Sequence, residues 1–173
     1  SSQELIAQPI AGANPIGFIL WHMARSQDWA VNTAIRDEPE VITHERWRGT
    51  SLAMPGIGTG FEPDEARVVA HQIDKVALLG YADAVHAEIT SWLRAQDDSV
   101  LDEIPDAEGH DAPHPEYQTP GFRAEMGSGP EHDDAVGRKG GLPAWVYLTS
   151  VAVTHLHRHL GEVDLLKDLL RRQ

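Results

Sequence analysis

The sequence predicts an all-α protein built from a few long helices. Apolar residues recur at helical spacing in three stretches, at about residues 16–35, 63–95 and 141–170. No stretch shows the alternation of apolar and polar residues that is typical of a half-buried β-strand. Long helices of this kind pack as a bundle, and 173 residues fit a single domain covering residues 1–173.

The first predicted helix begins after the sequence "GANP". Asn14 is placed to cap it, with Pro15 as the first helical residue, where a missing N–H group costs nothing. One face of this helix is formed by Phe18, Ile19, His22 and Trp29. His22 therefore lies on an apolar stripe.

Residues 36–62 are predicted to form a loop. The segment contains "MPGIGTGFEP", whose glycine and proline content is typical of loops. Its glycines do not match a phosphate-binding loop, because no Gly-Lys-Ser/Thr follows them.

The second predicted helix covers residues 63–95. A proline and three acidic residues stand at its start, where they suit the positive end of the helix dipole. Gly80 is the point where we expect a kink. At 1.5 Å per residue the helix is roughly 45–50 Å long, which favours a bundle.

Residues 97–141 form an acidic segment rich in Gly and Pro, predicted to be a loop or insertion. A structureless loop of this length is unusual inside a compact domain. The sequence leaves open whether it is a lid, a partly disordered excursion, or a segment with short helices around residues 100–104.

The last predicted helix carries three histidines. Pro143 fits its first turn, and its apolar stripe comprises Leu148, Ala152, His155, His159, Val163 and Leu166. His155 and His159 are four residues apart, so they share one face with Cβ atoms about 6 Å apart and can bind one metal ion. His157 lies on roughly the opposite face. The alternative is a pair of partly buried, hydrogen-bonded histidines without a metal.

His22 favours the metal site over that alternative. It is a third imidazole on the core stripe of another helix. Together with His155 and His159 it gives a facial set of ligands that leaves positions open for water or substrate.

The charge and composition argue against several classes of function. The formal net charge is −13, and basic residues are not clustered, so neither nucleic acid nor an anionic membrane is an expected partner. There is no cysteine, no long apolar run and no signal peptide, so we expect a cytoplasmic protein. No Gly-x-Ser-x-Gly elbow is present, which argues against a serine hydrolase.

Two motifs carry a resemblance to a known family. "NPIGFILWHMARSQDW" (residues 14–29), together with "THLHRHLGEVDLL" (residues 154–166), resembles the DinB/YfiT-like superfamily, in its DUF664 or mycothiol-transferase-like branch. The resemblance implies a four-helix bundle. Only about residues 2–7 precede the first motif, so we expect the family's first helix to be missing or truncated.

The resemblance also implies ligands and an activity. Carried onto this chain, His22, His155 and His159 hold a divalent metal ion, zinc or nickel, and Arg25 and Asp28 match polar positions that follow the first histidine. The implied activity is a metal-dependent thiol S-transferase or isomerase that uses a mycothiol- or bacillithiol-type cosubstrate on a small-molecule substrate. The alternatives are a metal-assisted hydrolase and a non-catalytic helical binding protein. The resemblance further implies a homodimer.

The roles of several other side chains are left open by the sequence. Glu162 borders the face of His159 and is expected to orient a ligand or bind substrate. Asp28 is expected either to hydrogen-bond a ligating imidazole or to form a helix-surface salt bridge with Arg25. Trp145 and Tyr147 either line a pocket or pack in the core. The histidines without a partner at metal spacing are expected at the surface: His44, His71, His86, His110, His114 and His132.

Overall fold

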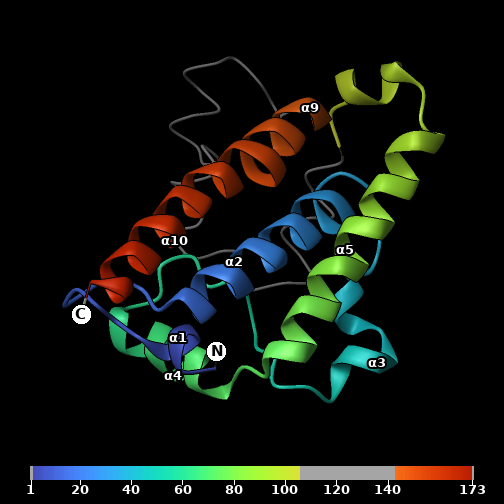
Figure 1. Ribbon diagram of the computed structural model, residues 1–173. Coiled ribbons are helices and arrows are strands. Elements are labelled where there is room, and N and C mark those ends of the chain that lie inside the picture. Colours follow the sequence, from blue (N-terminus) through green and yellow to red (C-terminus); the bar gives the residue numbers. More distant parts are fainter. Residues whose placement is uncertain (1, 106–142, 173) are drawn as a thin grey trace.

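The computed structural model describes residues 2–105 and 143–172, and within those two ranges it contains helices and no β-strand (Figure 1). The predicted all-α class is confirmed. In chain order the elements are α1 (Ser2–Ile6), α2 (Ile16–Asp28), η1 (Trp29–Thr33), η2 (Val41–Thr43), α3 (Glu45–Arg48), α4 (Pro63–Gln72), α5 (Lys75–Ala95), η3 (Asp98–Asp102), α9 (Ala144–Val146), η5 (Tyr147–His155) and α10 (Leu156–Arg171).

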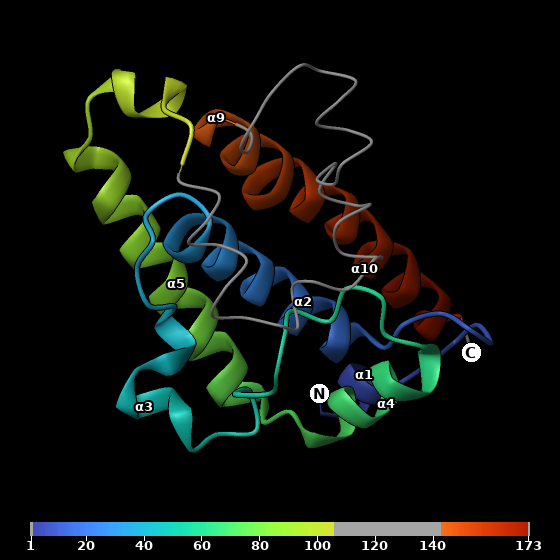
Figure 2. The same ribbon diagram turned by 180° about the vertical axis from the view of Figure 1, so that it is seen from behind.

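Helix α2 is the centre of the fold. In both views it lies between α5 and α10, with α1 and α4 packed near its N-terminus (Figures 1 and 2). Nearly all of its residues are buried, and it continues directly into a π-helical turn, η1. The predicted cap was wrong: Pro15 stands at the N-cap position, and no side chain caps the helix.

Helix α1 is a short helix that packs against α2. It reaches α2 closely because Gly17 has no side chain. A Cβ atom on Gly17 would lie 3.0 Å from the Leu5 carbonyl oxygen and 3.2 Å from the Leu5 Cβ. No helix in the described ranges has the length and apolar character needed to cross a bilayer.

The link of residues 36–62 is not all loop. It contains the two short elements η2 and α3, both shorter than the window in which a helical period is recognisable. They form because Val41, Ile42 and Trp47 enter the core. The rest of the link, from Gly49 onward, returns to α2 without a helix.

The helix predicted over residues 63–95 is two helices, α4 and α5. The chain leaves helical geometry at Ile73, and the Asp74 side chain caps α5 by accepting a hydrogen bond of 2.8 Å from the Ala77 N–H. The break is therefore not at Gly80. Gly80 lies inside α5, where a Cβ atom would be 3.3 Å from the Trp47 ring.

The last helical run also differs from a regular α-helix. Between α9 and α10 the nine residues of η5 wind as a π-helix that ends at His155. Gln27 on α2 donates a hydrogen bond of 2.9 Å to the Ala152 carbonyl within it. The predicted apolar stripe is present: Ala152, Val163 and Leu166 are buried, and Leu148 packs against the core.

Of the acidic segment, only its beginning is described. There η3 is a short 3-10 helix, which fits one of the alternatives left open by the sequence. The rest of the predicted loop or insertion, including His110, His114 and His132, lies outside the described residues.

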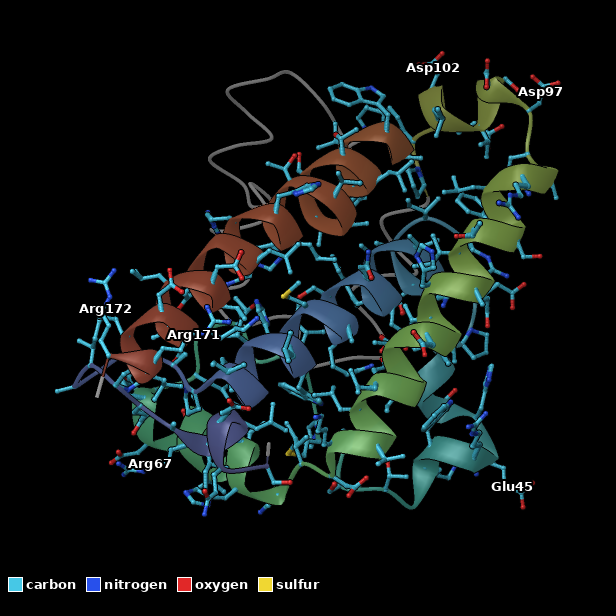
Figure 3. The ribbon with its side chains drawn as sticks, viewed as in Figure 1. Glu45, Arg67, Asp97, Asp102, Arg171 and Arg172 are labelled. Atoms are coloured by element: carbon cyan, nitrogen blue, oxygen red, sulfur yellow. The ribbon has the colours of Figure 1, made fainter. Side chains whose placement is uncertain are left out.

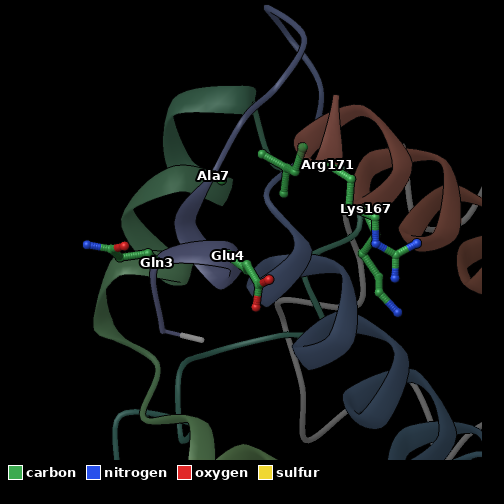
Figure 4. Close-up of a pocket in the computed structure, with 6 residues that line it drawn as sticks. Gln3, Glu4, Ala7, Lys167 and Arg171 are labelled. Carbon is green, nitrogen blue, oxygen red and sulfur yellow. The ribbon is translucent and has the colours of Figure 1, made fainter. Parts of the chain in front are cut away.

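Charged side chains lie on the outside of the bundle. The labelled side chains of Glu45, Arg67, Asp97, Asp102, Arg171 and Arg172 all lie at the periphery of the molecule (Figure 3). A surface pocket of about 450 Å³ lies between α1 and the end of α10, and charges of both signs line it (Figure 4). Its lining residues are Gln3, Glu4, Ala7, Lys167, Leu170 and Arg171.

Candidate metal centre

His22 is held by the backbone of the link. Its Nδ1 atom lies 2.5 Å from the carbonyl oxygen of Ile57, and a carbonyl oxygen only accepts hydrogen bonds. Nδ1 therefore carries the proton, and the lone pair of the neutral ring is on Nε2. The Phe18 ring stacks on the imidazole with 5.9 Å between centroids and 4° between planes, which fixes the ring orientation further.

The three histidines of the two motifs converge. The Nε2 atom of His155 lies 3.2 Å from Nε2 of His22 and 2.9 Å from Nε2 of His159. One nitrogen from each ring falls within 4.8 Å of the others. Ligand nitrogens around a tetrahedral ion with bonds of about 2.0–2.1 Å stand about 3.3 Å apart, so the cluster has the dimensions of such a site.

Glu162 orients the third imidazole. His159 Nδ1 lies 3.0 Å from Glu162 Oε2, one turn along α10. An ionised carboxylate only accepts, so Nδ1 donates, and in the neutral form of the ring the lone pair is on Nε2. His155 differs, because its buried Nδ1 atom has no hydrogen-bond partner in the described part of the chain. His157 is exposed, as its position on the opposite face predicted.

The environment keeps two of the imidazoles neutral. Burial lowers the pKa of His22 from 6.5 to about 4, and the nearby His159 and Arg158 lower it as well, against the hydrogen bond to Ile57. Burial, the two neighbouring histidines and Arg158 lower the pKa of His155 to about 3. Neutral imidazole is the form that binds metal ions, so at neutral pH His22 and His155 offer lone pairs with little competition from protons.

A pocket of about 170 Å³ opens beside the cluster. Its described lining combines the three histidines, two aromatic rings, a glycine-rich turn and one arginine: Asn14, Phe18, Ile19, His22, Gly58, Thr59, Gly60, Phe61, His155, Arg158 and His159. The rings of Phe18 and Phe61 lie 6.0 Å apart. The site thus has an apolar wall, a set of nitrogen ligands and a cationic side chain.

Helix α2 also fixes the turn that holds His22. Arg25 Nε donates to the Gly56 carbonyl at 3.2 Å, and Trp21 Nε1 donates to the Leu52 carbonyl at 3.0 Å. With the bond from His22 to Ile57, three side chains of α2 bind three carbonyl groups of the link. The sequence did not reveal this contact, because a backbone carbonyl has no residue type that marks it.

Arg25 is a buried residue. It is 4% exposed, and its guanidinium binds the carboxylate of Glu40, which is 3% exposed and also accepts a hydrogen bond of 3.0 Å from the Thr33 hydroxyl. The Nη1 atom of Arg25 also lies 3.7 Å from Oδ2 of Asp28, and both side chains are buried. The helix-surface salt bridge expected between them was therefore wrong in its location.

Asp28 binds the backbone of the link. Its carboxylate accepts hydrogen bonds from the N–H groups of Val41 at 2.9 Å and Ile42 at 3.0 Å, and from the Tyr81 hydroxyl at 2.6 Å and the Asn32 amide at 2.8 Å. Burial and the nearby Glu40 raise the pKa of Asp28, whereas all four donors require lone pairs on its oxygens. None of these partners is a histidine, so the expected hydrogen bond from Asp28 to a ligating imidazole is absent.

The remaining sequence candidates lie away from the pocket. His44, His71 and His86 are exposed, and within the described ranges only one group of side chains has metal-ligand spacing. Trp145 is 47% exposed, and Tyr147 packs its ring against Trp29 with 6.1 Å between centroids. Neither residue is among those that line the pocket.

The fold and the cluster define a helical bundle with three imidazoles gathered at one point. A family model of the DinB superfamily matches residues 1–133, and the chain belongs to this superfamily. The matched span includes His22 and the link that holds it, and it ends before His155. A search of curated proteins found no match.

Proposed function

We propose that His22, His155 and His159 hold a divalent metal ion through their Nε2 atoms. The observation that carries the proposal is the convergence of these three nitrogens, with Nδ1 of His22 and of His159 each engaged by an acceptor. A ring whose Nδ1–H is held in this way presents its Nε2 lone pair in a fixed direction. Zinc and nickel are the ions that suit imidazole ligands best here.

We propose further that the site transfers a low-molecular-weight thiol of the mycothiol or bacillithiol type, as an S-transferase or isomerase. A bound divalent ion lowers the pKa of a coordinated thiol, and three neutral imidazoles leave its double charge for an anionic ligand to balance. In the transferase reaction the thiolate sulfur would form a bond to the electrophilic carbon of the substrate, the bond from that carbon to its leaving group would break, and the leaving group would depart with the electron pair, while the thiol proton passes to solvent.

The surroundings favour this chemistry over hydrolysis. A metal ion lowers the pKa of bound water by itself, and hydrolysis is assisted further by a carboxylate or a free imidazole that acts as a general base. None of the described residues lining the pocket is acidic. Glu162 is the nearest acid to the cluster by sequence, and its carboxylate accepts a hydrogen bond from His159.

Metal analysis and a conjugation assay test the proposal together. We expect purified protein to contain one divalent ion per chain and to conjugate a small thiol to an alkylating fluorophore. His155→Ala should lose the ion and the conjugation, whereas His157→Ala, an equal change on the exposed face of the same helix, should keep both. Conjugation that persists in His155→Ala refutes the mechanism. Ester or amide hydrolysis without thiol would identify a hydrolase instead.

Three expectations from the sequence stay predictions. They are the identity of the small-molecule substrate, assembly as a homodimer and a cytoplasmic location. Sedimentation of the purified chain tests the homodimer directly.

A further inference from the structure

The carbonyl group that orients His22 lies in a turn with a permissive backbone. Ile57 stands between Gly56 and Gly58, whose φ angles are +72° and +89°. Glycine adopts many backbone conformations at low cost, so the residue types of this turn do not by themselves fix the direction of its carbonyl groups. Contacts from outside the turn therefore contribute to that direction, and Arg25 makes one of them at Gly56.

Arg25 binds two groups with different atoms of its guanidinium. Nε donates to the Gly56 carbonyl at 3.2 Å, and Nη1 donates to the Glu40 carboxylate. Because the guanidinium is planar, holding Nη1 on the carboxylate also sets the direction of the Nε–H group. The Gly56 carbonyl and the Ile57 nitrogen belong to one planar peptide group, so binding this carbonyl restrains the backbone that carries the Ile57 carbonyl.

Glu40 is itself held at several atoms. Its Oε2 atom accepts from Arg25, and its Oε1 atom accepts a hydrogen bond of 3.0 Å from the Thr33 hydroxyl. Its backbone carbonyl accepts from the Thr43 N–H group at 3.0 Å and from the Thr43 hydroxyl at 2.7 Å. Arg25 and Glu40 are 4% and 3% exposed, so salt in the solvent screens their attraction little. Glu40 is thus a fixed support for the guanidinium.

Stability alone accounts poorly for a buried ion pair. Removing two charges from water offsets much of their attraction, and an apolar pair of similar volume is often as stable. The place of this pair in the fold indicates a different role. It binds the residue next to Ile57, whose carbonyl lies 2.5 Å from Nδ1 of His22.

We propose that Arg25 and Glu40 are positioning residues for the candidate metal centre. The pair restrains the turn at Gly56, so that the carbonyl of Ile57 stays in place to accept the Nδ1–H group of His22. The Nε2 lone pair of His22 then keeps its direction toward the other two imidazoles. The inference rests on the proposed function in what it says of metal binding, whereas the orientation of His22 can be measured without a metal ion.

The experiment follows the tautomer of His22 by ¹⁵N NMR of the full, metal-free chain labelled at histidine. The ¹⁵N shifts of an imidazole distinguish the Nδ1–H from the Nε2–H tautomer, and the His22 resonances are assigned by their loss in His22→Ala. We expect the Nδ1–H tautomer in wild type, because a carbonyl oxygen only accepts. His159 is an internal control, since Glu162 holds its Nδ1–H group independently of the link.

The double variant Arg25→Met/Glu40→Leu removes both charges together. Asp28 keeps its four hydrogen-bond donors in this variant, so the free energy of unfolding should stay close to that of wild type. His22 should then populate both tautomers while His159 is unchanged. Competition with a chromophoric chelator should show metal binding that is weaker by about tenfold.

Two further variants complete the comparison. Arg36→Met/Glu88→Leu removes another ion pair, with 3.0 Å between Nη1 and Oε1, which joins Arg36 to α5 rather than to the turn. It should change neither the His22 tautomer nor the metal affinity. Arg25→Lys keeps the charge but lacks the planar pair of donors, so it should give mixed tautomers at His22 even if the double variant does not fold.

The outcomes distinguish the inference from the proposed function. If His22 stays entirely in the Nδ1–H tautomer in the double variant, or in Arg25→Lys where the double variant does not fold, the positioning role is overturned and the metal site stands. If His22 changes tautomer as expected but wild type binds no divalent ion, the proposed function fails, and Arg25 and Glu40 orient an imidazole that is not a metal ligand.

Discussion

Gly58 provides the sharpest test of how the link supports the candidate metal centre. Its backbone has φ of +89°, and a Cβ atom there would lie 2.8 Å from Cζ3 of Trp21 and 3.0 Å from the Phe18 ring. Trp21, which makes the closer contact, is fully buried and does not line the pocket, so its ring can shift only by disturbing the packed core. Gly60 is the matched control, because its φ is +80° and nothing lies within 4 Å of its added Cβ.

The two glycines allow the steric cost to be isolated. A left-handed backbone conformation costs an L-residue about 1–2 kcal/mol, which applies to Gly58→Ala and to Gly60→Ala alike. Forcing an extra methyl group into a packed core costs about 1–3 kcal/mol more, which applies to Gly58→Ala alone. We therefore expect the free energy of unfolding to fall by about 2–5 kcal/mol in Gly58→Ala and by about 1–2 kcal/mol in Gly60→Ala.

Denaturant unfolding of the metal-free proteins measures both values. A competition titration with a chromophoric chelator should also show weaker metal binding by Gly58→Ala. The reason is that Gly58 follows Ile57, whose carbonyl holds His22, and crowds Phe18, which stacks on the His22 ring. Equal losses of stability in the two variants would refute the close packing of the link against α2.

Four further outcomes are expected. Asp28→Asn replaces one of the two acceptor oxygens of the side chain by a donor, which leaves buried N–H or O–H donors without an acceptor. Denaturant unfolding should therefore show a free energy of unfolding that is lower by about 2–5 kcal/mol. Glu162→Ala should weaken metal binding about tenfold. Glu162→Gln should recover part of the affinity, because the amide oxygen still accepts a hydrogen bond from His159 Nδ1. Equal metal affinities in wild type and both variants would argue against the role of Glu162 in orienting His159. A divalent ion at a free concentration of 100 times its dissociation constant should stabilise the fold by about 2.7 kcal/mol, and a chelator should reverse the shift in Tm; an unchanged Tm contradicts the site. In the metal-free protein, the free energy of unfolding should fall as the pH drops from 6.5 toward 5. The reason is that His22 takes up a proton near pH 6.5 in the unfolded chain, whereas burial lowers its pKa in the folded protein to about 4. The dependence of the free energy of unfolding on pH should be weaker in His22→Ala.

The sequence was sufficient to predict which imidazoles gather at one point. The spacing of His155 and His159 places both on one helix face, and His22 lies on the apolar stripe of another helix. Each of these signals is a side-chain identity at a helical interval. The same interval also predicted correctly that His157 faces outward.

The contacts that hold the histidine cluster in place could not be predicted from residue types at helical spacing. The carbonyl of Ile57 holds His22, and the carboxylate of Glu40 binds Arg25, through contacts that depend on how the link folds back on α2. Short elements such as η2 and α3 span too few residues to show a period. The burial of Arg25 and Asp28 follows from that folding, and their spacing alone suggested the helix surface.

The sequence contains a signal for the break between α4 and α5, but the helical spacing of the apolar residues favoured a continuous helix. Asp74 is a good N-cap residue, but apolar residues recur at helical spacing on both sides of it, and that recurrence favoured one long helix. The π-helical segment η5 has no comparable signal, because apart from His155 it consists of apolar and hydroxyl residues that are equally common in α-helices.

The histidines that meet in the bundle come from distant parts of the polypeptide, since positions 22 and 155 are separated by 133 positions in the sequence. During translation, the first of them leaves the ribosome long before the other two have been synthesised. A nascent chain therefore cannot bring the three imidazoles together until the carboxyl-terminal helix has docked, so the proposed metal site can form only after that step. A chain truncated before residue 155 would lack two of the three imidazoles, so it would also lack the proposed metal site.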